Sequence, residues 1–174
     1  MTLQELQSYV RDVPDFPKPG INFKDITPLL RAPEALRTAC ALLGEPFGDQ
    51  RVTHVAAIES RGFIFGSIVA QNLGAGFVPI RKPGKLPWTK RRHEYTLEYG
   101  SDALEIHDDA LTADDRVLVI DDVLATGGTA AAAAHLVAGF GSTIVGIATV
   151  IELEFLAGRQ KLGMDVPVHS VIRY

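Results

Sequence analysis

Short runs of branched apolar residues alternate along the chain with longer segments in which apolar positions recur at helical spacing. The apolar runs predict strands, over residues 54–60, 77–82, 117–121, 143–152 and 166–174. The segments with helical spacing predict helices, over residues 2–11, 33–43, 62–74, 128–139 and 154–162. Apolar strands that alternate with helices are typical of an α/β domain with a mainly parallel central sheet.

Other segments depart from this alternation. "PDFPKPGINF", residues 14–23, is predicted to be extended, because proline lacks an amide donor and disfavours helix. Residues 83–94 form a predicted loop of about a dozen residues, a length that suggests a function. "EYTLEY" and "ALEIHDD" predict an antiparallel hairpin that turns through Gly100 and Ser101. No repeat or linker divides the chain, so residues 1–174 are expected to form a single domain.

The segment "VLVIDDVLATGGTA", residues 117–130, carries the most specific chemistry. An apolar strand is predicted to end at Asp121 and Asp122, before a small-residue loop and a helix. Ligands of parallel α/β sheets bind beyond the carboxyl ends of the strands. The backbone N–H groups at a helix N-terminus suit a phosphate, and glycines allow the backbone to approach it. The aspartates would repel a phosphate, but they can accept hydrogen bonds from sugar hydroxyls.

This segment therefore predicts a ligand in which a phosphate lies next to a ribose. The alternative interpretation is an acidic pair at an ordinary turn between a strand and a helix. The sequence contains no G-x-x-x-x-G-K-[ST] motif and no G-x-G-x-x-G motif after a strand, which argues against a Walker-type NTPase and a dinucleotide-binding fold.

The strand followed by "DDVLATGGT" resembles the motif by which type I phosphoribosyltransferases bind 5-phosphoribosyl 1-pyrophosphate (PRPP). "PDFPKPGINFKDITPLL", "ESRGFIFG", "IRKPGKLP" and "YTLEYG" are similar to segments of the adenine phosphoribosyltransferase family, in the order in which that family shows them. The similarity extends from about residue 6 to the last residue, Tyr174.

The resemblance implies a type I phosphoribosyltransferase fold with an N-terminal hood, within about residues 1–30, and a flexible catalytic loop. The implied reaction is purine salvage, in which adenine and PRPP give AMP and pyrophosphate. Mg²⁺ is expected to be held mainly by substrate oxygens and water, so no protein side chain is predicted as a metal ligand. A homodimer is also implied, in which Arg81 reaches the site of the neighbouring subunit.

The resemblance also assigns residues to the two anionic groups of PRPP. The residues expected at the ribose and the 5′-phosphate are Asp121, Asp122, Ala125, Thr126, Gly127, Gly128 and Thr129. Those expected at the pyrophosphate are Ser60, Arg61, Arg81, Lys82 and Lys85, and Arg61 is also expected to be catalytic. Cations at this place would stabilise the charge that grows on the leaving group. The family further suggests a cis peptide bond between Glu59 and Ser60. For the basic residues, a solvated charged surface is the alternative interpretation.

Adenine is expected to stack on Phe23 and to be read by the backbone of Asn22 and Lys24. Glu98 is assigned the transfer of a purine proton, with Tyr99 beside it on the lid. A general acid or base positioned in this way is a recurrent catalytic device. The alternatives are core packing for Phe23 and a solvated strand edge for Glu98.

Composition narrows the classes of function. The chain has 174 residues, of which 47% are hydrophobic and 22% charged, as in an ordinary globular protein. Its net charge of −4 argues against a general nucleic-acid or anionic-membrane binder, and no apolar run reaches membrane-spanning length. The single cysteine, Cys40, cannot form an internal disulfide, so a cytoplasmic location is expected.

The sequence is also compatible with two other functions. One is a phosphoribosyltransferase for another purine, such as hypoxanthine or xanthine. The other is a non-catalytic PRPP-sensing regulator, although such regulators usually carry an additional element that binds DNA or RNA, for which this chain has no room.

Overall fold

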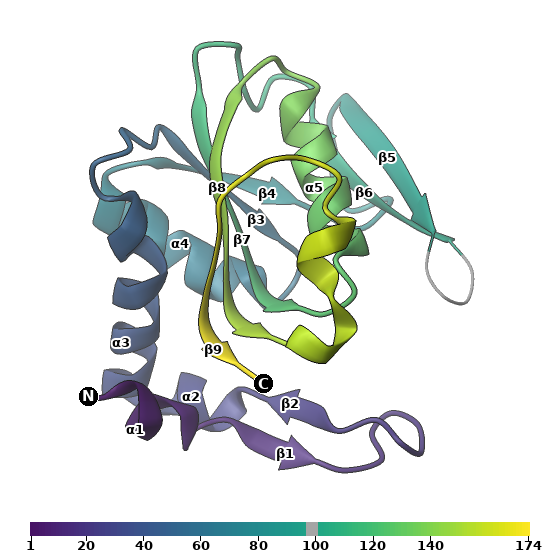
Figure 1. Ribbon diagram of the computed structural model, residues 1–174. Helices are drawn as coiled ribbons and strands as arrows, with labels where there is room; N and C mark the ends of the chain where they lie inside the picture. The colour runs from purple at the N-terminus through teal and green to yellow at the C-terminus, as the bar shows by residue number, and fades with distance from the viewer. Residues whose placement is uncertain (97–100) are drawn as a thin grey trace. The chain divides into compact units, whose positions relative to one another are not determined.

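The computed structural model describes residues 1–96 and 101–174 (Figure 1). The chain divides into two compact units, Met1–Leu42 and Leu43–Tyr174, and each is described by itself. The expectation of a single domain over residues 1–174 is not tested by this division and stays a prediction.

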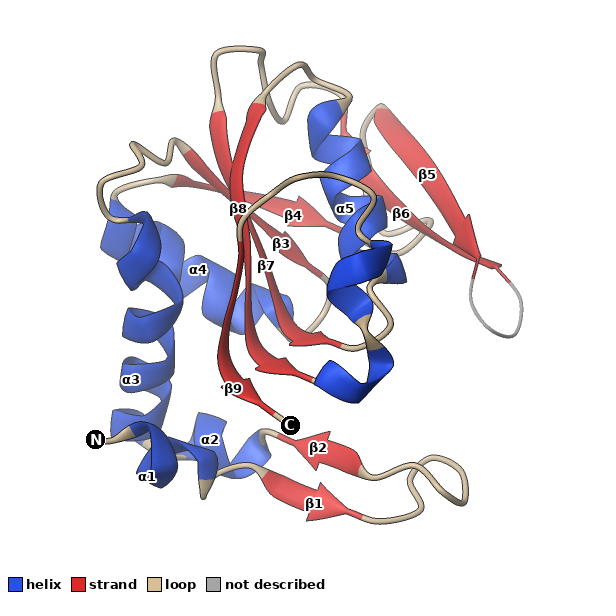
Figure 2. Ribbon diagram, viewed as in Figure 1, coloured by secondary structure: helices blue, strands red, loops and turns tan. Residues whose placement is uncertain are grey.

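The first unit combines short helices with a two-stranded hairpin (Figure 2). Its elements are α1 (Leu3–Gln7), β1 (Arg11–Val13), β2 (Phe23–Asp25), α2 (Thr27–Arg31) and the start of α3 (Pro33–Gly44). The helix predicted over residues 2–11 is wrong beyond Gln7. Strand β1 pairs antiparallel with β2, and Pro14 disfavours helix at the residue before it.

The second unit contains a parallel sheet in the order β4-β3-β7-β8-β9. Its strands are β3 (His54–Ile58), β4 (Gly76–Ile80), β7 (Arg116–Leu124), β8 (Thr143–Glu152) and β9 (Val168–Arg173). The predicted α/β class with a mainly parallel sheet is confirmed. Among the residues that the structure describes, no helix is long and apolar enough to cross a bilayer.

Two helices pack on opposite faces of this sheet. A Cβ atom built on Gly66 of α4 (Gly62–Leu73) would lie 2.4 Å from the Cβ of Ala57. The preceding residue, Ala56, instead packs in the cluster that contains the alanines of α5 (Gly128–Ala138). Successive residues of a strand face opposite sides, so the two helices cover opposite faces.

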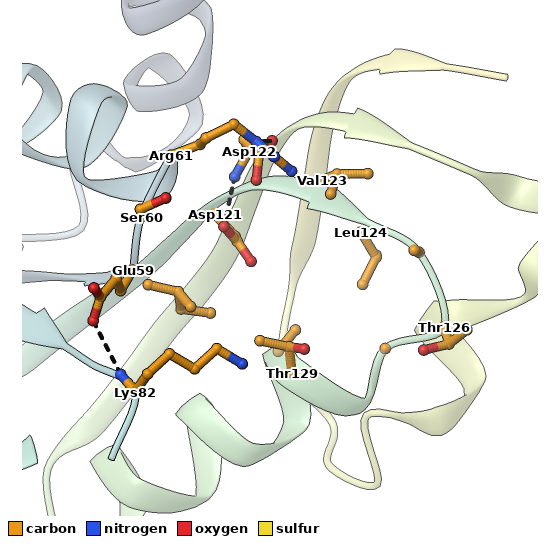
Figure 3. Close-up of a pocket in the computed structure, with 14 residues that line it drawn as sticks. Glu59, Ser60, Arg61, Lys82, Asp121, Asp122, Val123, Leu124, Thr126 and Thr129 are labelled. Atoms are coloured by element: carbon orange, nitrogen blue, oxygen red, sulfur yellow. Dashed lines mark hydrogen bonds and ion pairs between the residues drawn. The ribbon is translucent and has the colours of Figure 1, made fainter. Parts of the chain in front are cut away.

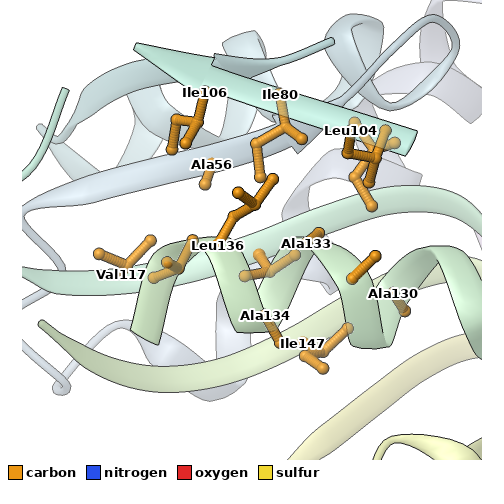
Figure 4. Packing of buried hydrophobic residues seen from close by; sticks show 14 of the residues in the cluster. Ala56, Ile80, Leu104, Ile106, Val117, Ala130, Ala133, Ala134, Leu136 and Ile147 are labelled. Carbon is orange, nitrogen blue, oxygen red and sulfur yellow. The ribbon is translucent and has the colours of Figure 1, made fainter. Parts of the chain in front are cut away.

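The largest apolar cluster joins α5, the sheet and a second hairpin (Figure 4). Leu104 and Ile106 of β6 (Ser101–His107) are fully buried in it, against Ala133 and Leu136 of α5. The small alanine side chains let α5 approach the sheet closely. Because β6 pairs with β5 (Lys90–Thr96), this cluster also anchors the hairpin beside α5.

Two predictions in this unit are corrected. The loop expected over residues 83–94 is shorter, because β5 begins at Lys90, which pairs with His107 of β6. The guanidinium of Arg91, the next residue of β5, lies 3.7 Å from the ring centroid of Phe140. The helix expected over residues 154–162 is instead two 3₁₀ helices, Glu154–Leu156 and Gly158–Lys161. Ala157 separates them with a left-handed φ of 52°, a conformation that ends a helix.

The contact between α4 and β3 can be tested by replacing Gly66 with alanine. The added methyl group would lie 2.4 Å from Ala57 and 3.3 Å from the ring of Phe77. Overpacking of this kind costs about 1–3 kcal/mol, which exceeds the gain of about 1 kcal/mol from placing alanine in a helix. We expect a lower free energy of unfolding in urea denaturation.

Gly48→Ala is the matched control, because the nearest atom to its added methyl group is 3.7 Å away. It should leave the free energy of unfolding nearly unchanged. Equal stability of Gly66→Ala and the unchanged protein would contradict the close packing of α4 on β3.

Candidate active site

The site lies where the connections of the sheet diverge. Strands β3 and β7 are neighbours, but β4 lies outside β3 and β8 lies outside β7. The loops that leave β3 and β7 therefore separate, and such a switch point is where parallel α/β sheets bind ligands. A cavity of about 280 Å³ opens there (Figure 3).

The cavity brings together most of the residues predicted to bind PRPP. Those in its wall from the pyrophosphate group are Ser60, Arg61 and Lys82. Those from the ribose and 5′-phosphate group are Asp121, Asp122, Ala125, Thr126, Gly127 and Thr129. Gly128 begins α5 next to this wall.

The two aspartates lie inside β7, which continues to Leu124 and does not end at Asp121 as predicted. Pairing of β7 with β8 runs to Leu124, whereas pairing with β3 stops at Ile120. The aspartates are therefore held by β8 on one side and released from β3 on the other, which exposes them to the cavity.

The carboxylates of these aspartates have different surroundings. Asp122 is 6% exposed, and its Oδ2 accepts a hydrogen bond from Nε of Arg61. Oδ1 of Asp121 accepts a hydrogen bond of 2.9 Å from the Asp122 amide. Burial and the neighbouring Asp122 carboxylate raise the pKa of Asp121 well above its ordinary value. A second negative charge on the pair is therefore costly, and Arg61 offsets only part of that cost.

The loop between β7 and α5 is shaped for an anion. Gly127 has a φ of +85°, a left-handed conformation that favours glycine. The free N–H groups and the positive dipole end of α5 follow directly. The hydroxyl of Thr129 lies in the same wall and donates a hydrogen bond of 3.3 Å to the hydroxyl of Tyr95. Residues 125–129 are called the phosphate loop below.

Lys82 supplies a cation from the other side of the cavity, where its side chain extends toward Thr129 (Figure 3). Its ammonium group forms an ion pair with Asp102 and lies 3.4 Å from the hydroxyl of Tyr95. Burial lowers the pKa of Lys82, but its hydrogen bonds to Asp102 and Tyr95 outweigh that effect and raise it. Lys82 therefore stays charged at neutral pH.

Arg81 and Lys85 are held beside the cavity and do not line it. Nε and Nη2 of Arg81 each donate a hydrogen bond of 3.1 Å to the carboxylate of Glu59. The backbone carbonyl of Lys85 accepts a further hydrogen bond from Arg81. The hydrogen bonds from Arg81 lower the pKa of Glu59, so this carboxylate stays ionised.

Known proteins are similar to this chain over almost its whole length. Residues 26–166 match the model of the phosphoribosyl transferase domain. Adenine phosphoribosyltransferase of Nitrosococcus oceani is 54% identical over 99% of this chain and 100% of its own length. That of Gloeobacter violaceus is 58% identical over 98% of this chain and 99% of its own length.

The chain belongs to the adenine phosphoribosyltransferase family.

Solved structures of this family share the fold. The crystal structure of adenine phosphoribosyltransferase from Rhodothermus marinus is 54% identical and superposes with a TM-score of 0.94, covering 99% of this chain and 98% of that one. The Saccharomyces cerevisiae enzyme, complexed with adenine and an imino-altritol bisphosphate, is 40% identical with a TM-score of 0.91, covering 97% of both chains.

The residues that the family resemblance assigns to adenine lie in the first unit. Phe23 packs edge-to-face on Phe16 with ring centroids 5.3 Å apart. The side chains of Asn22 and Lys24 both contact the carboxylate of Asp12. Their role stays a prediction. Glu98 and Tyr99 lie outside the described residues. The expected cis peptide bond between Glu59 and Ser60 is present.

Reasoning from sequence missed Tyr95 and Asp102. They face each other across the hairpin, and the Tyr95 hydroxyl donates a hydrogen bond of 3.2 Å to Asp102. Through Lys82 and Thr129 they connect the two walls of the cavity. The "YTLEYG" motif contains Tyr95, but only the pairing of β5 with β6 shows which residue lies opposite.

The raised pKa of Asp121 predicts that Asp121→Asn stabilises the free protein at neutral pH. Ionising a group whose pKa is raised on folding costs folding free energy once the pH passes its unfolded-state pKa. The variant removes that cost, so we expect a higher melting temperature at neutral pH. The difference should shrink as the pH falls toward about 4, where the unfolded-state carboxyl becomes protonated.

Asp122→Asn is the control, because it breaks the ion pair with Arg61 and should show no such gain. The assigned cause is the raised pKa of Asp121. It would be contradicted if the difference in melting temperature between Asp121→Asn and the unchanged protein grew in acid or was absent at every pH.

Proposed function

We propose that this protein transfers the 5-phosphoribosyl group of PRPP to adenine, which gives AMP and pyrophosphate in purine salvage. The main support is the cavity at the switch point, where adjacent carboxylates lie between a phosphate loop and two cations. The activity follows from membership of a family whose members are 53–58% identical over almost the whole chain.

In this proposal the phosphate loop binds the 5′-phosphate of PRPP. Backbone N–H groups of the loop and of the first turn of α5 donate to the phosphate oxygens, and Thr126 and Thr129 add hydroxyl donors. Asp121 and Asp122 accept hydrogen bonds from the ribose hydroxyls. Their negative charge also stabilises the positive charge that develops on the sugar ring as the bond to pyrophosphate breaks.

The pyrophosphate lies on the side of Ser60, Arg61 and Lys82. Both cations are paired with carboxylates in the free protein, Arg61 with Asp122 and Lys82 with Asp102. Binding exchanges a carboxylate for a phosphate oxygen at each cation, so little new charge has to be desolvated. As pyrophosphate leaves, these cations neutralise its growing charge. Arg81 and Lys85 complete this group, with Arg81 reaching the site of the second subunit in a homodimer.

Adenine attacks the anomeric carbon through N9. Phe23 stacks on the purine, an interaction worth about 1–3 kcal/mol for a stacked base. The backbone of Asn22 and Lys24 reads the adenine edge, which rejects a purine with an oxo group in place of the amine. Glu98 transfers the purine proton as a general acid or base, with Tyr99 assigned to the lid beside it.

The donor set fits a Mg²⁺ ion that is held through the substrate. Mg²⁺ binds carboxylate, phosphate and water oxygens and retains several waters. In this proposal the ligands of the ion would be pyrophosphate and ribose oxygens together with water. The ion would supply charge neutralisation on the leaving pyrophosphate. The reaction takes place in the cytoplasm.

Incubation with PRPP, Mg²⁺ and one purine base at a time tests the proposal. Chromatography should detect AMP with adenine and no comparable nucleotide with hypoxanthine or xanthine. IMP or XMP as the main product would assign the site to another purine. PRPP binding without any nucleotide product would identify a regulator.

Asp122→Asn tests the ribose contact. The substitution preserves shape but removes the charge that accepts a hydroxyl hydrogen bond, an interaction of about 1.5–3 kcal/mol. We expect KM for PRPP to rise by about tenfold or more, with a slower turnover. Asp114→Asn, at an exposed aspartate outside the cavity, is the control. Unchanged kinetics of Asp122→Asn would place the ribose elsewhere.

Glu98→Gln tests the proton transfer, because the amide keeps the shape of the side chain but cannot exchange the proton. A positioned general acid or base contributes about 10²–10⁴-fold, so the single-turnover rate should fall by about a hundredfold. KM for PRPP should change far less. A single-turnover rate within about threefold of the unchanged protein would be incompatible with this role.

A further inference from the structure

The phosphate loop is supported from behind by a second backbone segment, at Gly158. A Cβ atom built on Gly127 would lie 2.2 Å from the carbonyl oxygen of Gly158. A Cβ atom built on Gly158 would lie 2.3 Å from the carbonyl oxygen of Ala125 and 3.1 Å from the amide nitrogen of Gly127. The two backbones therefore approach each other without space for a side chain on either.

The two glycines are required for different reasons. Gly127 has a left-handed φ of +85°, so its conformation already favours glycine. Gly158 does not belong to the residues with positive φ, so only the space between it and the loop excludes a side chain. A substitution of Gly158 therefore acts on the loop position and not on the local conformation of residue 158.

The residue after Gly158 ties this segment to the sheet. Nε and Nη2 of Arg159 each donate a hydrogen bond of 2.6 Å to the carboxylate of Glu152 at the end of β8. Nη1 of Arg159 donates 2.8 Å to the carbonyl of Val168 in β9. Glu152 is only 4% exposed. Arg159 itself is only half-buried, but its bidentate contact with the buried Glu152 carboxylate has a defined geometry, so it fixes where the adjacent Gly158 lies.

Neither residue reaches the cavity. Gly158 and Arg159 are absent from its wall, whereas Ala125 and Gly127, which Gly158 contacts, are part of it. Any effect of Gly158 or Arg159 on a ligand must therefore pass through the loop.

We infer that Gly158 and Arg159 are positioning residues for 5′-phosphate binding. The Glu152–Arg159 pair anchors Gly158, and Gly158 holds the backbone of residues 125–127 in the form that binds the phosphate before substrate arrives. The loop is then ordered when the protein folds, so phosphate binding does not carry the entropy cost of ordering it and the affinity is higher. This inference rests on the proposed function, because it takes the phosphate loop as the 5′-phosphate site.

Gly158→Ala is the direct test, because it leaves the Glu152–Arg159 pair in place and pushes only on the loop. Isothermal titration would measure the dissociation constants of ribose 5-phosphate and of Mg²⁺-pyrophosphate. We expect ribose 5-phosphate to bind about tenfold to a hundredfold more weakly, which is the effect of losing about one hydrogen bond to a charged group. Pyrophosphate, which binds on the Arg61 and Lys82 side, should keep its affinity. KM for PRPP should rise with little change in kcat.

Two control variants distinguish a displaced phosphate loop from a loss of overall stability. Gln160→Ala alters an exposed side chain in the same 3₁₀ helix and should leave both dissociation constants unchanged. Gly66→Ala is expected to lose stability at the far contact of α4 with β3 and should also leave ribose 5-phosphate binding unchanged.

Arg159→Lys provides a second test if Gly158→Ala does not fold. Lysine keeps the charge near Glu152 but loses the bidentate geometry, so ribose 5-phosphate should bind more weakly while pyrophosphate binding is retained. Equal ribose 5-phosphate affinity of either folded variant and the unchanged protein would overturn the inference. Failure of the unchanged protein to bind ribose 5-phosphate would instead overturn the proposed function.

Discussion

The unequal pairing of β7 is the constraint from which the site follows. Strand β7 is the centre of the sheet, and its residues 117–120 are fully buried. Its hydrogen bonds to β3 stop at Ile120, while those to β8 continue to Leu124. One edge of the strand is therefore open over the residues that carry Asp121 and Asp122. The same divergence of β3 and β7 separates the cation-bearing segments from the phosphate loop.

The divergence of β3 and β7 also places positively charged groups around the two aspartates. Two adjacent carboxylates repel an anionic ligand unless positively charged groups lie close to them. The N-terminus of α5 lies on one side of these carboxylates, and Arg61 and Lys82 line the cavity with them. In the free protein each of these cations, and Arg81 beside them, has a carboxylate partner: Asp122, Asp102 and Glu59. The protein itself therefore neutralises each of these three cations.

Much of the fold and of the candidate site could be predicted from the sequence, because it depends on residues that lie close together along the chain. The apolar run before Asp121 predicts a buried strand, and the glycines and threonines after it predict an anion-binding turn. Pairing between segments that lie far apart along the chain could not be predicted from the sequence. Such pairing moved the start of β5 to Lys90 and extended β7 to Leu124, where a tertiary contact outweighs local propensity. The helix expected over residues 154–162 is interrupted by the left-handed conformation of Ala157.

The sequence by itself determined the α/β class, the alternation of the central strands with α4 and α5, and the chemical character of the phosphate loop, since these depend on hydrophobic period and on residue types a few positions apart. Only the tertiary structure decided which residues face one another. It placed Asp102 on Lys82, Glu59 on Arg81 and Gly158 against Gly127, pairs whose members are separated by 20 or more positions along the chain. Such contacts are set by strand order and register, and no local pattern of residues records them.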